Sequence, residues 1–379
     1  MTDTIKNFVK KNKEPALNTL RELCHIPAPS FGERRRAEYC KKWLEDVGAK
    51  DVYIDEVNNC ILPMNCEGSN EITVIAAHLD TVFPDTESYP EYHEDEEKIY
   101  CPGVGDDTAS VVVMLYGIKY MLENGIAPQK GILFVCNSCE EGLGNLVGTR
   151  QIMKDFEGRV KQFITLDEDI GFCVNGAVGS HRYKVEVETE GGHSFSAFGK
   201  KNAIEALSEI ITEIYKIKVP QKTGATTTYN VGTITGGTSV NTIAQSAEML
   251  CEYRSDDREC LAVMKSAFED VFAKAVSDEV RLNVTLLGER PCKGEVDAVT
   301  EERLIDAYRK AVAEVTGQEI SLVSASTDAN VPMSLGIAAV DMGVFRNGGT
   351  HTREEWLDKS CISDGLNIFI RVIHSLIEE

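Results

Sequence analysis

Gly131-Ile-Leu-Phe-Val-Cys136-Asn-Ser-Cys139-Glu140-Glu141-Gly142 is an apolar run that ends in two adjacent carboxylates. The apolar half predicts a buried strand. Two like charges this close raise each other's proton affinity unless a metal ion or solvent compensates them. Because adjacent side chains can point in different directions, one glutamate can bind a metal while the other transfers protons. The stretch therefore predicts a strand of a buried sheet that ends in a metal-dependent site.

Further apolar runs flank this strand and alternate with helical patterns. The other predicted strands are Val52–Ile54, Ile72–Ala77 and Gln162–Leu166, and the helical patterns cover Ile5–Gly48 in two pieces, Thr108–Asn124 and Gly148–Asp155. Strands that alternate with helices are typical of an α/β sheet. Within the first helical region, Arg34-Arg35-Arg36 is interpreted as a solvated helix face.

A different pattern begins near Gly179 and ends near Pro291. Its predicted order is strand, helix, two strands, helix, strand, which is the order of a ferredoxin-like sandwich. After Pro291 the α/β pattern returns, with a helix over Glu301–Thr316, strands near Ser321–Val323 and Ala338–Met342, and a last helix from Ser360. We therefore expect an α/β domain formed by residues 1–178 and 293–379, interrupted by an α+β domain at residues 179–292.

Composition limits the classes of function. The chain has 379 residues, a length that suggests about two domains, and its 42% hydrophobic and 26% charged residues are normal for a globular protein. A formal charge of −22 argues against nucleic acid or an anionic membrane as the main partner. The sequence shows neither an apolar signal core nor a membrane-length apolar run, and its twelve cysteines show no disulfide-type spacing. We expect a cytoplasmic protein with reduced, buried thiols; Cys136 and Cys139 are interpreted as packing residues.

Other acids and histidines follow the predicted strands. His78-Leu-Asp80 follows Ile72–Ala77, Asp167 ends the next strand, and His351 lies in a loop after Met342. Asp106-Asp107 lies at the start of a predicted helix. Taken alone, the pair is interpreted as an N-cap of that helix. Ligands of mixed nitrogen and oxygen type suit zinc, and cobalt or manganese nearly as well. Taken together, the residues predict two divalent metal ions that share one carboxylate.

These motifs resemble the M20 family of metallopeptidases and amidohydrolases. The resemblance spans the chain from Ile26-Pro-Ala-Pro-Ser-Phe-Gly-Glu33 to Ser326-Thr-Asp-Ala-Asn330 and His351-Thr-Arg-Glu-Glu-Trp356. It implies a zinc-peptidase-type catalytic domain with a mixed sheet and helices on both faces. The insertion would be the family's lid, which commonly forms a homodimer.

The resemblance also implies the roles of individual residues. One metal ion would bind His78 and Asp167, the other would bind Glu141 and His351, and Asp106 would bridge them; Asp80 would orient His78, and Glu140 would act as general base on a metal-bridging water. In the inserted domain, His193, Asn241 and Arg254 correspond to family residues that reach the substrate carbonyl or carboxylate, with the histidine often supplied by the partner subunit. Without the resemblance, Asn241 is interpreted as an ordinary residue of a turn and Arg254 as a charged residue on the surface.

We therefore predict a dinuclear hydrolase that cleaves an amide bond in a small peptide, as a di- or tripeptidase does. Aspartate at position 167 favours the aminopeptidase and dipeptidase branches of the family. The alternative is an N-acyl amino acid deacylase of the acetylornithine deacetylase or succinyl-diaminopimelate desuccinylase type. A catalytically silent binding protein is disfavoured because every expected ligand and the base are present.

Overall fold

A computed structural model describes residues 2–84 and 91–377 of the chain. The chain divides into two compact units, the first formed by Met1–Ala177 with Gly294–Glu379 and the second by Val178–Lys293. The insertion predicted at residues 179–292 lies within the second unit. In the described ranges, no helix combines the length and the apolar character that crossing a membrane requires.

The first unit is built on an eight-stranded mixed sheet. The strand order is β1-β2-β6-β3-β7-β16-β8-β15. Strands β6, β3, β7 and β16 run parallel to their neighbours in this series, whereas β2 is antiparallel to β6 and β8 is antiparallel to β16. The bounds are β1 Tyr53–Ile54, β2 Cys60–Met64, β3 Ile72–His78, β6 Gly131–Asn137, β7 Val160–Asp169, β8 Phe172–Ala177, β15 Ser321–Ala325 and β16 Ala338–Phe345.

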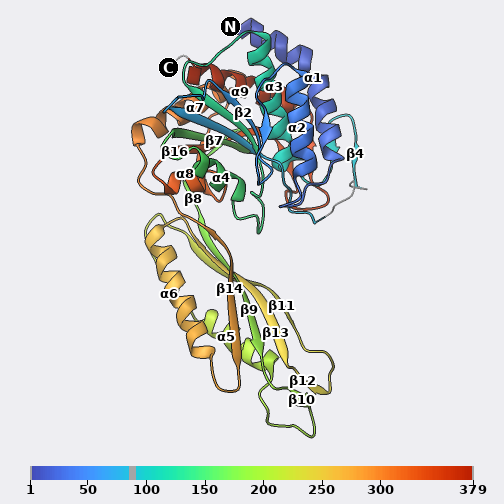
Figure 1. The fold of residues 1–379 in the computed structure, drawn as a ribbon, viewed down its shortest axis with the longest axis vertical. Helices are drawn as coiled ribbons and strands as arrows, with labels where there is room; N and C mark the ends of the chain where they lie inside the picture. The colour runs from blue at the N-terminus through green and yellow to red at the C-terminus, as the bar shows by residue number, and fades with distance from the viewer. Residues whose placement is uncertain (1, 85–90, 378–379) are drawn as a thin grey trace. The chain divides into compact units, whose positions relative to one another are not determined.

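Helices cover both faces of this sheet, as Figure 1 shows. One apolar core joins the sheet to α1 Thr2–Cys24, α2 Arg34–Asp46, α3 Ser110–Glu123, α7 Ala298–Thr316 and α9 Cys361–Ile377. A second core, on the other face, includes residues of α4 Val147–Asp155 and α8 Asn330–Ser334. The central strands are therefore buried on both faces, which explains why β6 and β16 are almost wholly apolar.

The first unit also contains a small sheet of order β17-β18-β5-β4, which holds the loop that carries His351. Its strands are β4 His93–Glu94, β5 Lys98–Tyr100, β17 Asn347–Gly348 and β18 Trp356–Asp358.

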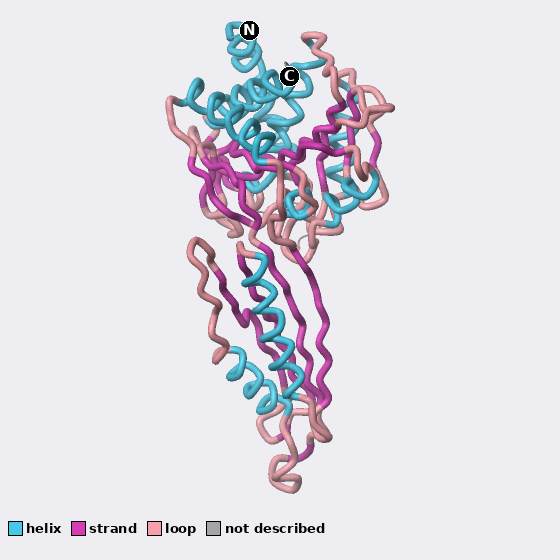
Figure 2. The backbone as a smooth tube through the Cα atoms, turned by 90° about the vertical axis from the view of Figure 1, so that its left-hand side faces the viewer, coloured by secondary structure: helices cyan, strands magenta, loops and turns pink. Residues whose placement is uncertain are grey.

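The second unit is an antiparallel sheet of order β11-β13-β9-β14. Helices α5 and α6 share an apolar core with this sheet, and Figure 2 shows the helices running along it. The chain order β9-α5-β11-β13-α6-β14 is the predicted one. The bounds are β9 Gly179–Glu188, β10 Gly192–His193, α5 Ala203–Ile214, β11 Thr227–Gly236, β12 Thr242–Ile243, β13 Ser246–Ser255, α6 Arg258–Ala275 and β14 Arg281–Arg290.

One interpretation of the sequence was wrong. Arg36 does not lie on a solvated face, because its side chain is only 1% exposed. Its Nε donates to the carbonyl oxygen of Ile26 at 2.7 Å, and its Nη1 donates to the carbonyl oxygen of Leu79 at 2.9 Å. Nη1 also lies 3.1 Å from Oγ1 of Thr108. These bonds engage Nε and Nη1, whereas Nη2 is buried without a hydrogen-bond partner, so the guanidinium is held inside the first unit by two of its three nitrogens.

Candidate dinuclear metal centre

The predicted ligands lie where the parallel strands end. His78 is the last residue of β3, Asp167 lies near the end of β7, and Glu141 follows β6. These strands are neighbours in the order β6-β3-β7, so their carboxyl ends meet at one edge of the sheet. In open α/β sheets this edge is where ligands bind.

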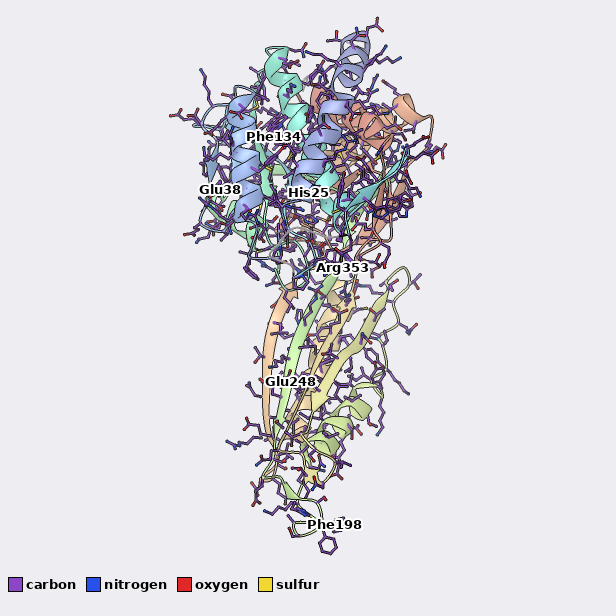
Figure 3. The ribbon with its side chains drawn as sticks, turned by 90° about the vertical axis from the view of Figure 1, so that its right-hand side faces the viewer. His25, Glu38, Phe134, Phe198, Glu248 and Arg353 are labelled. Atoms are coloured by element: carbon purple, nitrogen blue, oxygen red, sulfur yellow. The ribbon has the colours of Figure 1, made fainter. Side chains whose placement is uncertain are left out.

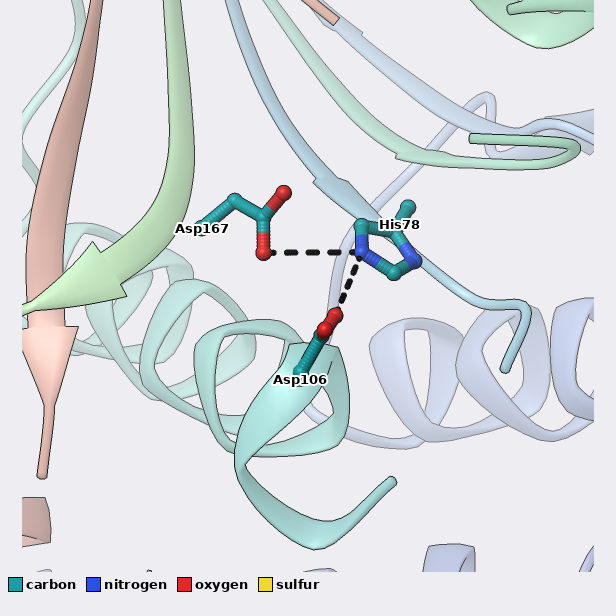
Figure 4. A group of neighbouring side chains, drawn as sticks. All are labelled: His78, Asp106 and Asp167. Atoms are coloured by element: carbon teal, nitrogen blue, oxygen red, sulfur yellow. Dashed lines mark ion pairs between the residues drawn. The ribbon is translucent and has the colours of Figure 1, made fainter. Parts of the chain in front are cut away.

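The first group of ligands consists of His78, Asp106 and Asp167, drawn in Figure 4. Nε2 of His78 lies 3.1 Å from Oδ1 of Asp106 and 3.5 Å from Oδ1 of Asp167. Both aspartates approach the same ring nitrogen, as the dashed lines in Figure 4 show. His78 is fully buried.

The second group consists of Asp106, Glu141 and His351. Nε2 of His351 lies 3.1 Å from Oδ2 of Asp106 and 3.4 Å from Oε1 of Glu141. Asp106 thus places one carboxylate oxygen on each histidine, the arrangement expected of a bridging ligand. The His351 side chain is 56% exposed, so the second group opens to solvent, whereas no side chain of the first group is more than 13% exposed.

The hydrogen bond of His78 fixes which ring nitrogen can bind a metal. Nδ1 lies 3.0 Å from the carbonyl oxygen of Asp80, and a carbonyl can only accept, so Nδ1 carries a proton. In the neutral ring the lone pair is then on Nε2, which faces Asp106 and Asp167. Nε2 is buried and makes no hydrogen bond of acceptable geometry. This is the tautomer that a metal ligand needs.

The carboxylates carry more negative charge than the two imidazoles balance. Burial and the charge of Asp106 raise the pKa of Glu141 to about 8. Burial also raises the pKa of Asp167 well above its usual range. The nearby carboxylates of Asp106 and Glu141 raise the pKa of His351 to about 10. Without a metal ion, these groups therefore bind protons more tightly, which reduces the repulsion between the carboxylates. A bound cation would reduce the same repulsion.

The donor set fits divalent metal ions. In each group the donor atoms lie within 4.8 Å of one another, and they comprise imidazole nitrogens and carboxylate oxygens. Oε1 of Glu141, like Nε2 of His78, is buried without a hydrogen-bond partner. These two atoms have no hydrogen-bond partner and lie among carboxylates whose charge is not balanced. A bound divalent cation would supply both the missing partner and the missing positive charge.

Neither aspartate of the pair Asp106-Asp107 caps a helix. Both have non-helical backbone angles, the peptide bond between them is cis, and helix α3 begins only at Ser110. No side-chain hydrogen bond caps α3. Instead, Oδ2 of Asp107 accepts the backbone N–H of His78 at 2.8 Å. The interpretation of the pair as a helix cap was therefore wrong. Asp106 belongs to the candidate ligand groups, and Asp107 holds the backbone of His78.

Asp80 lies beside both His78 and the glutamate pair. Its Oδ1 is 3.5 Å from Nδ1 of His78, farther than its own carbonyl oxygen. Its two carboxylate oxygens accept the backbone N–H groups of Glu140 and Glu141, each at 3.0 Å. Burial opposes its ionisation, but His78, Ser30 and these N–H groups hold the pKa of Asp80 below its usual range. Glu140 is 5% exposed and belongs to neither ligand group found among the described residues.

The structure places the predicted substrate residues of the second unit in two locations. His193 in β10 pairs with Thr242 in β12, and the backbone N–H of Ser194 donates to the carbonyl oxygen of Asn241 at 2.9 Å. His193 and Asn241 are therefore close neighbours. Arg254 lies near the far end of β13, where its Nε donates to Oε1 of Glu252 at 2.8 Å.

Sequence reasoning missed several buried acids that hold the ligand-bearing segments. Glu355 accepts the backbone N–H groups of Gly103, Gly105 and Asp106 at 2.7, 2.9 and 3.1 Å. Asp341 accepts the N–H of Asp167 at 2.7 Å. A lone aspartate within the apolar run Ala338–Phe345 is a sequence signal that was available for Asp341. For Glu355, adjacent to Glu354 in a polar loop, no such signal exists.

Comparisons with known proteins show which proteins this chain is similar to. The succinyl-diaminopimelate desuccinylase of Corynebacterium glutamicum is 25% identical over 365 residues, covering 93% of this chain and 94% of that protein. A tripeptidase structure from Staphylococcus aureus superposes with a TM-score of 0.74 at 22% identity, covering 97% and 99% of the two chains. The YXEP protein of Bacillus subtilis, described as a dinuclear metal binding peptidase from the M20 family, gives a TM-score of 0.64 at 16% identity, covering 97% and 99%.

The chain also matches the model of a whole protein family. The model described as Peptidase family M20/M25/M40 matches residues 74–375, a range that includes every predicted ligand and most of both units. The chain therefore belongs to the peptidase family M20/M25/M40.

Proposed function

We propose that this protein is a dinuclear metal-dependent hydrolase that cleaves an amide bond in small peptides, with Glu140 as the general base. One observation carries the proposal. Of two adjacent, buried glutamates, Glu141 belongs to a ligand group and Glu140 does not. That division leaves one carboxylate for the metal and one for protons.

The residues of the chain divide the work as follows. His78, Asp106, Asp167, Glu141 and His351 would hold two divalent ions; their mixed nitrogen and oxygen donors favour zinc, with cobalt or manganese as substitutes. When bound, such ions polarise a carbonyl group and lower the pKa of water. Glu140 accepts the proton of the attacking water and returns it to the leaving amine.

The name of the relative from Corynebacterium glutamicum supports a second candidate, an N-acyl amino acid deacylase. Both reactions attack the same kind of carbonyl group, so the metal centre does not distinguish them. A panel of dipeptides, tripeptides, N-acetyl amino acids and N-succinyl amino acids, with products identified by chromatography, separates the two. Turnover of peptides supports the peptidase, and turnover confined to acylated amino acids would replace it by the deacylase.

The role of Glu140 has its own test. Glu140→Gln keeps the shape of the side chain but cannot accept a proton, so we expect turnover to fall about 10²- to 10⁴-fold. Metal content, measured by plasma emission spectrometry, should remain that of the unmodified protein. Full activity in this variant would refute the assignment.

We further propose that the protein works as a homodimer formed through the second unit. Support comes from the two locations of the substrate residues: His193 and Asn241 lie together, whereas Arg254 lies near the other end of β13. A small peptide cannot reach both locations on one chain, so two copies would supply them to one substrate.

A further inference from the structure

The backbone on either side of Glu140 is held by two buried carboxylates from different parts of the chain. Asp80 accepts the N–H groups of Glu140 and Glu141, each at 3.0 Å. Oε1 of Glu33 accepts the preceding N–H, that of Cys139, at 3.1 Å. Three successive N–H groups are thus fixed at the segment that carries the proposed base.

Cys139 has a backbone conformation that needs such support. Its φ is +58°, in the left-handed region that residues with a Cβ rarely adopt. This single residue turns the chain between the end of β6 and the glutamate pair. Residues held in unfavourable backbone conformations persist only where their surroundings fix them.

Glu33 is itself rigidly placed. It is fully buried, and Oε1 also accepts the N–H of Phe31 at 2.7 Å and lies 3.2 Å from Sγ of Cys139. Its other oxygen, Oε2, is buried without a hydrogen-bond partner. Ser30, in the same loop, places its hydroxyl 2.6 Å from Oδ2 of Asp80 and 3.2 Å from the carbonyl oxygen of Glu141. The loop therefore contacts both ends of the Cys139–Glu141 segment.

We propose that Glu33 is a positioning residue for Glu140. By fixing the N–H of Cys139, it sets the turn after β6 that separates the direction of Glu140 from that of Glu141. This role rests on the proposed function of Glu140 as base. Glu33 is in neither ligand group found among the described residues, so its loss should act on the rate of the chemical step and leave metal binding in place.

Two variants of similar volume separate positioning from packing. Glu33→Leu removes the acceptor, whereas Glu33→Gln keeps one oxygen, which can replace Oε1 because that atom makes all three contacts. We expect Glu33→Leu to lower kcat about 10²-fold, the effect of misplacing a reacting group by roughly 1 Å. KM should change less than about threefold, and Glu33→Gln should keep kcat within about fivefold. Two metal ions per chain should remain in both variants.

Controls separate this effect from a loss of stability. Glu38, labelled in Figure 3, is an exposed acid on the same helix region, and Glu38→Leu should behave as the unmodified protein. Asp297 accepts the N–H of Thr300 at 2.8 Å and caps α7. Asp297→Ala should lower thermal stability and leave kcat per folded molecule unchanged.

Hydrogen exchange of a peptide covering residues 138–142 gives a readout that does not depend on activity. We expect faster exchange in Glu33→Leu and unchanged exchange in Glu33→Gln. Unchanged exchange in Glu33→Leu, or an unchanged kcat despite faster exchange, would overturn the proposal. If the unmodified, metal-loaded protein turned over no amide in the panel, the proposed function would fail. Exchange at residues 138–142 would still decide whether Glu33 fixes this segment.

Discussion

Arg36 shows how one buried side chain joins the N-terminal helices to the metal centre. It starts from α2 and bonds the carbonyl oxygens of Ile26 and Leu79, and Leu79 lies between His78 and Asp80. It also contacts Thr108, which follows the aspartate pair. The guanidinium can do this because its fork of donors satisfies several acceptors at once.

Arg36→Met should therefore destabilise the first unit by about 3 kcal/mol, since it leaves the buried carbonyl of Leu79 and the partly buried carbonyl of Ile26 without this donor. The matched control is Arg34→Met on the same helix, where the arginine is 55% exposed and the loss should stay within about 0.5 kcal/mol. Both tryptophans, Trp43 and Trp356, belong to the first unit, so their fluorescence in urea reports on it alone. Equal losses in the two variants would contradict the buried role.

Asp106 is the residue shared by both ligand groups. Asp106→Ala should therefore reduce bound metal from about two ions per chain to fewer than one, because a bridging ligand serves both sites. Asp167→Ala removes a ligand of the first group only, and about one ion should remain. Metal analysis after gel filtration checks both numbers. Loss of a single ion from Asp106→Ala would show that it does not bridge.

The sequence identified the candidate ligands that the structure brings together, but not the residues that hold them. A histidine or acid directly after an apolar strand can be recognised locally, as His78 and Asp167 were. The role of Glu355 depends on contacts with a distant part of the sequence, such as Gly105, which lies 250 positions earlier. Glu33 contacts Cys139 across 106 positions. Such contacts have no local pattern, since they arise only when the chain folds.

At the scale of elements, the loop Gly103–Asp107 decides where Asp106 lies. Glu355 holds three of its N–H groups, and Asn347 lies against Gly105 so closely that a Cβ there would collide with the Asn347 side chain. Asn347 is in turn fixed, because its backbone N–H donates to Oδ1 of Asp169 at 3.0 Å. The loop is therefore held by Glu355 and by Asn347, and it cannot shift without breaking one of these contacts.

Gly105→Ala should displace the loop and weaken metal binding about 10- to 100-fold, the usual cost of disturbing the groups that hold a ligand. Competition with a coloured chelator measures the metal dissociation constant. Gly232→Ala, in β11 of the second unit, serves as the control, because its Cβ would meet only the Asn230 side chain, at an ordinary contact distance of 3.6 Å. An unchanged constant in Gly105→Ala would mean that the loop does not position Asp106.

Strands were predicted where their burial leaves a simple pattern. The parallel strands β3 and β6 are apolar because helices cover both of their faces, and the alternating β9 has one apolar face. Strand β2 was missed because it contains Pro63, and β8 because it contains Asn175-Gly176, residues that are rare in strands. Pairing with β6 and with β15 and β16 outweighs these local preferences.

At the scale of the whole molecule, the two units should respond differently to metal. All five proposed ligands lie in the first unit, where buried carboxylates repel one another without a cation. Free metal at about 1,000 times its dissociation constant adds about 4 kcal/mol, which raises the melting temperature of a unit of this size by roughly 10 °C. Calorimetry with and without a chelator should show this shift in the transition seen by tryptophan fluorescence. A chelator that leaves that transition in place would contradict the metal centre.

The assembly can be tested through the separation of His193 from Arg254. Residues 246 to 254 of β13 span roughly 26 Å, and an extended tripeptide reaches only about 11 Å. If one substrate contacts both, the two residues must come from different subunits, and the resemblance to the family indicates that the partner supplies His193. Glu140→Gln and His193→Ala should each be nearly inactive alone, the latter through a loss of about 10²-fold. In a mixed dimer the chain with intact Glu140 receives an intact His193 from its partner.

Dissociating and remixing equal amounts of the two variants should therefore restore about a quarter of the activity of the unmodified protein. Random pairing makes about half of the dimers mixed, and each mixed dimer has one complete site out of two. Remixing His193→Ala with a chain that carries both substitutions controls for the handling and should restore nothing. If His193 serves its own chain, neither site of a mixed dimer is complete, and the absence of recovery would then exclude the exchange of this residue between subunits.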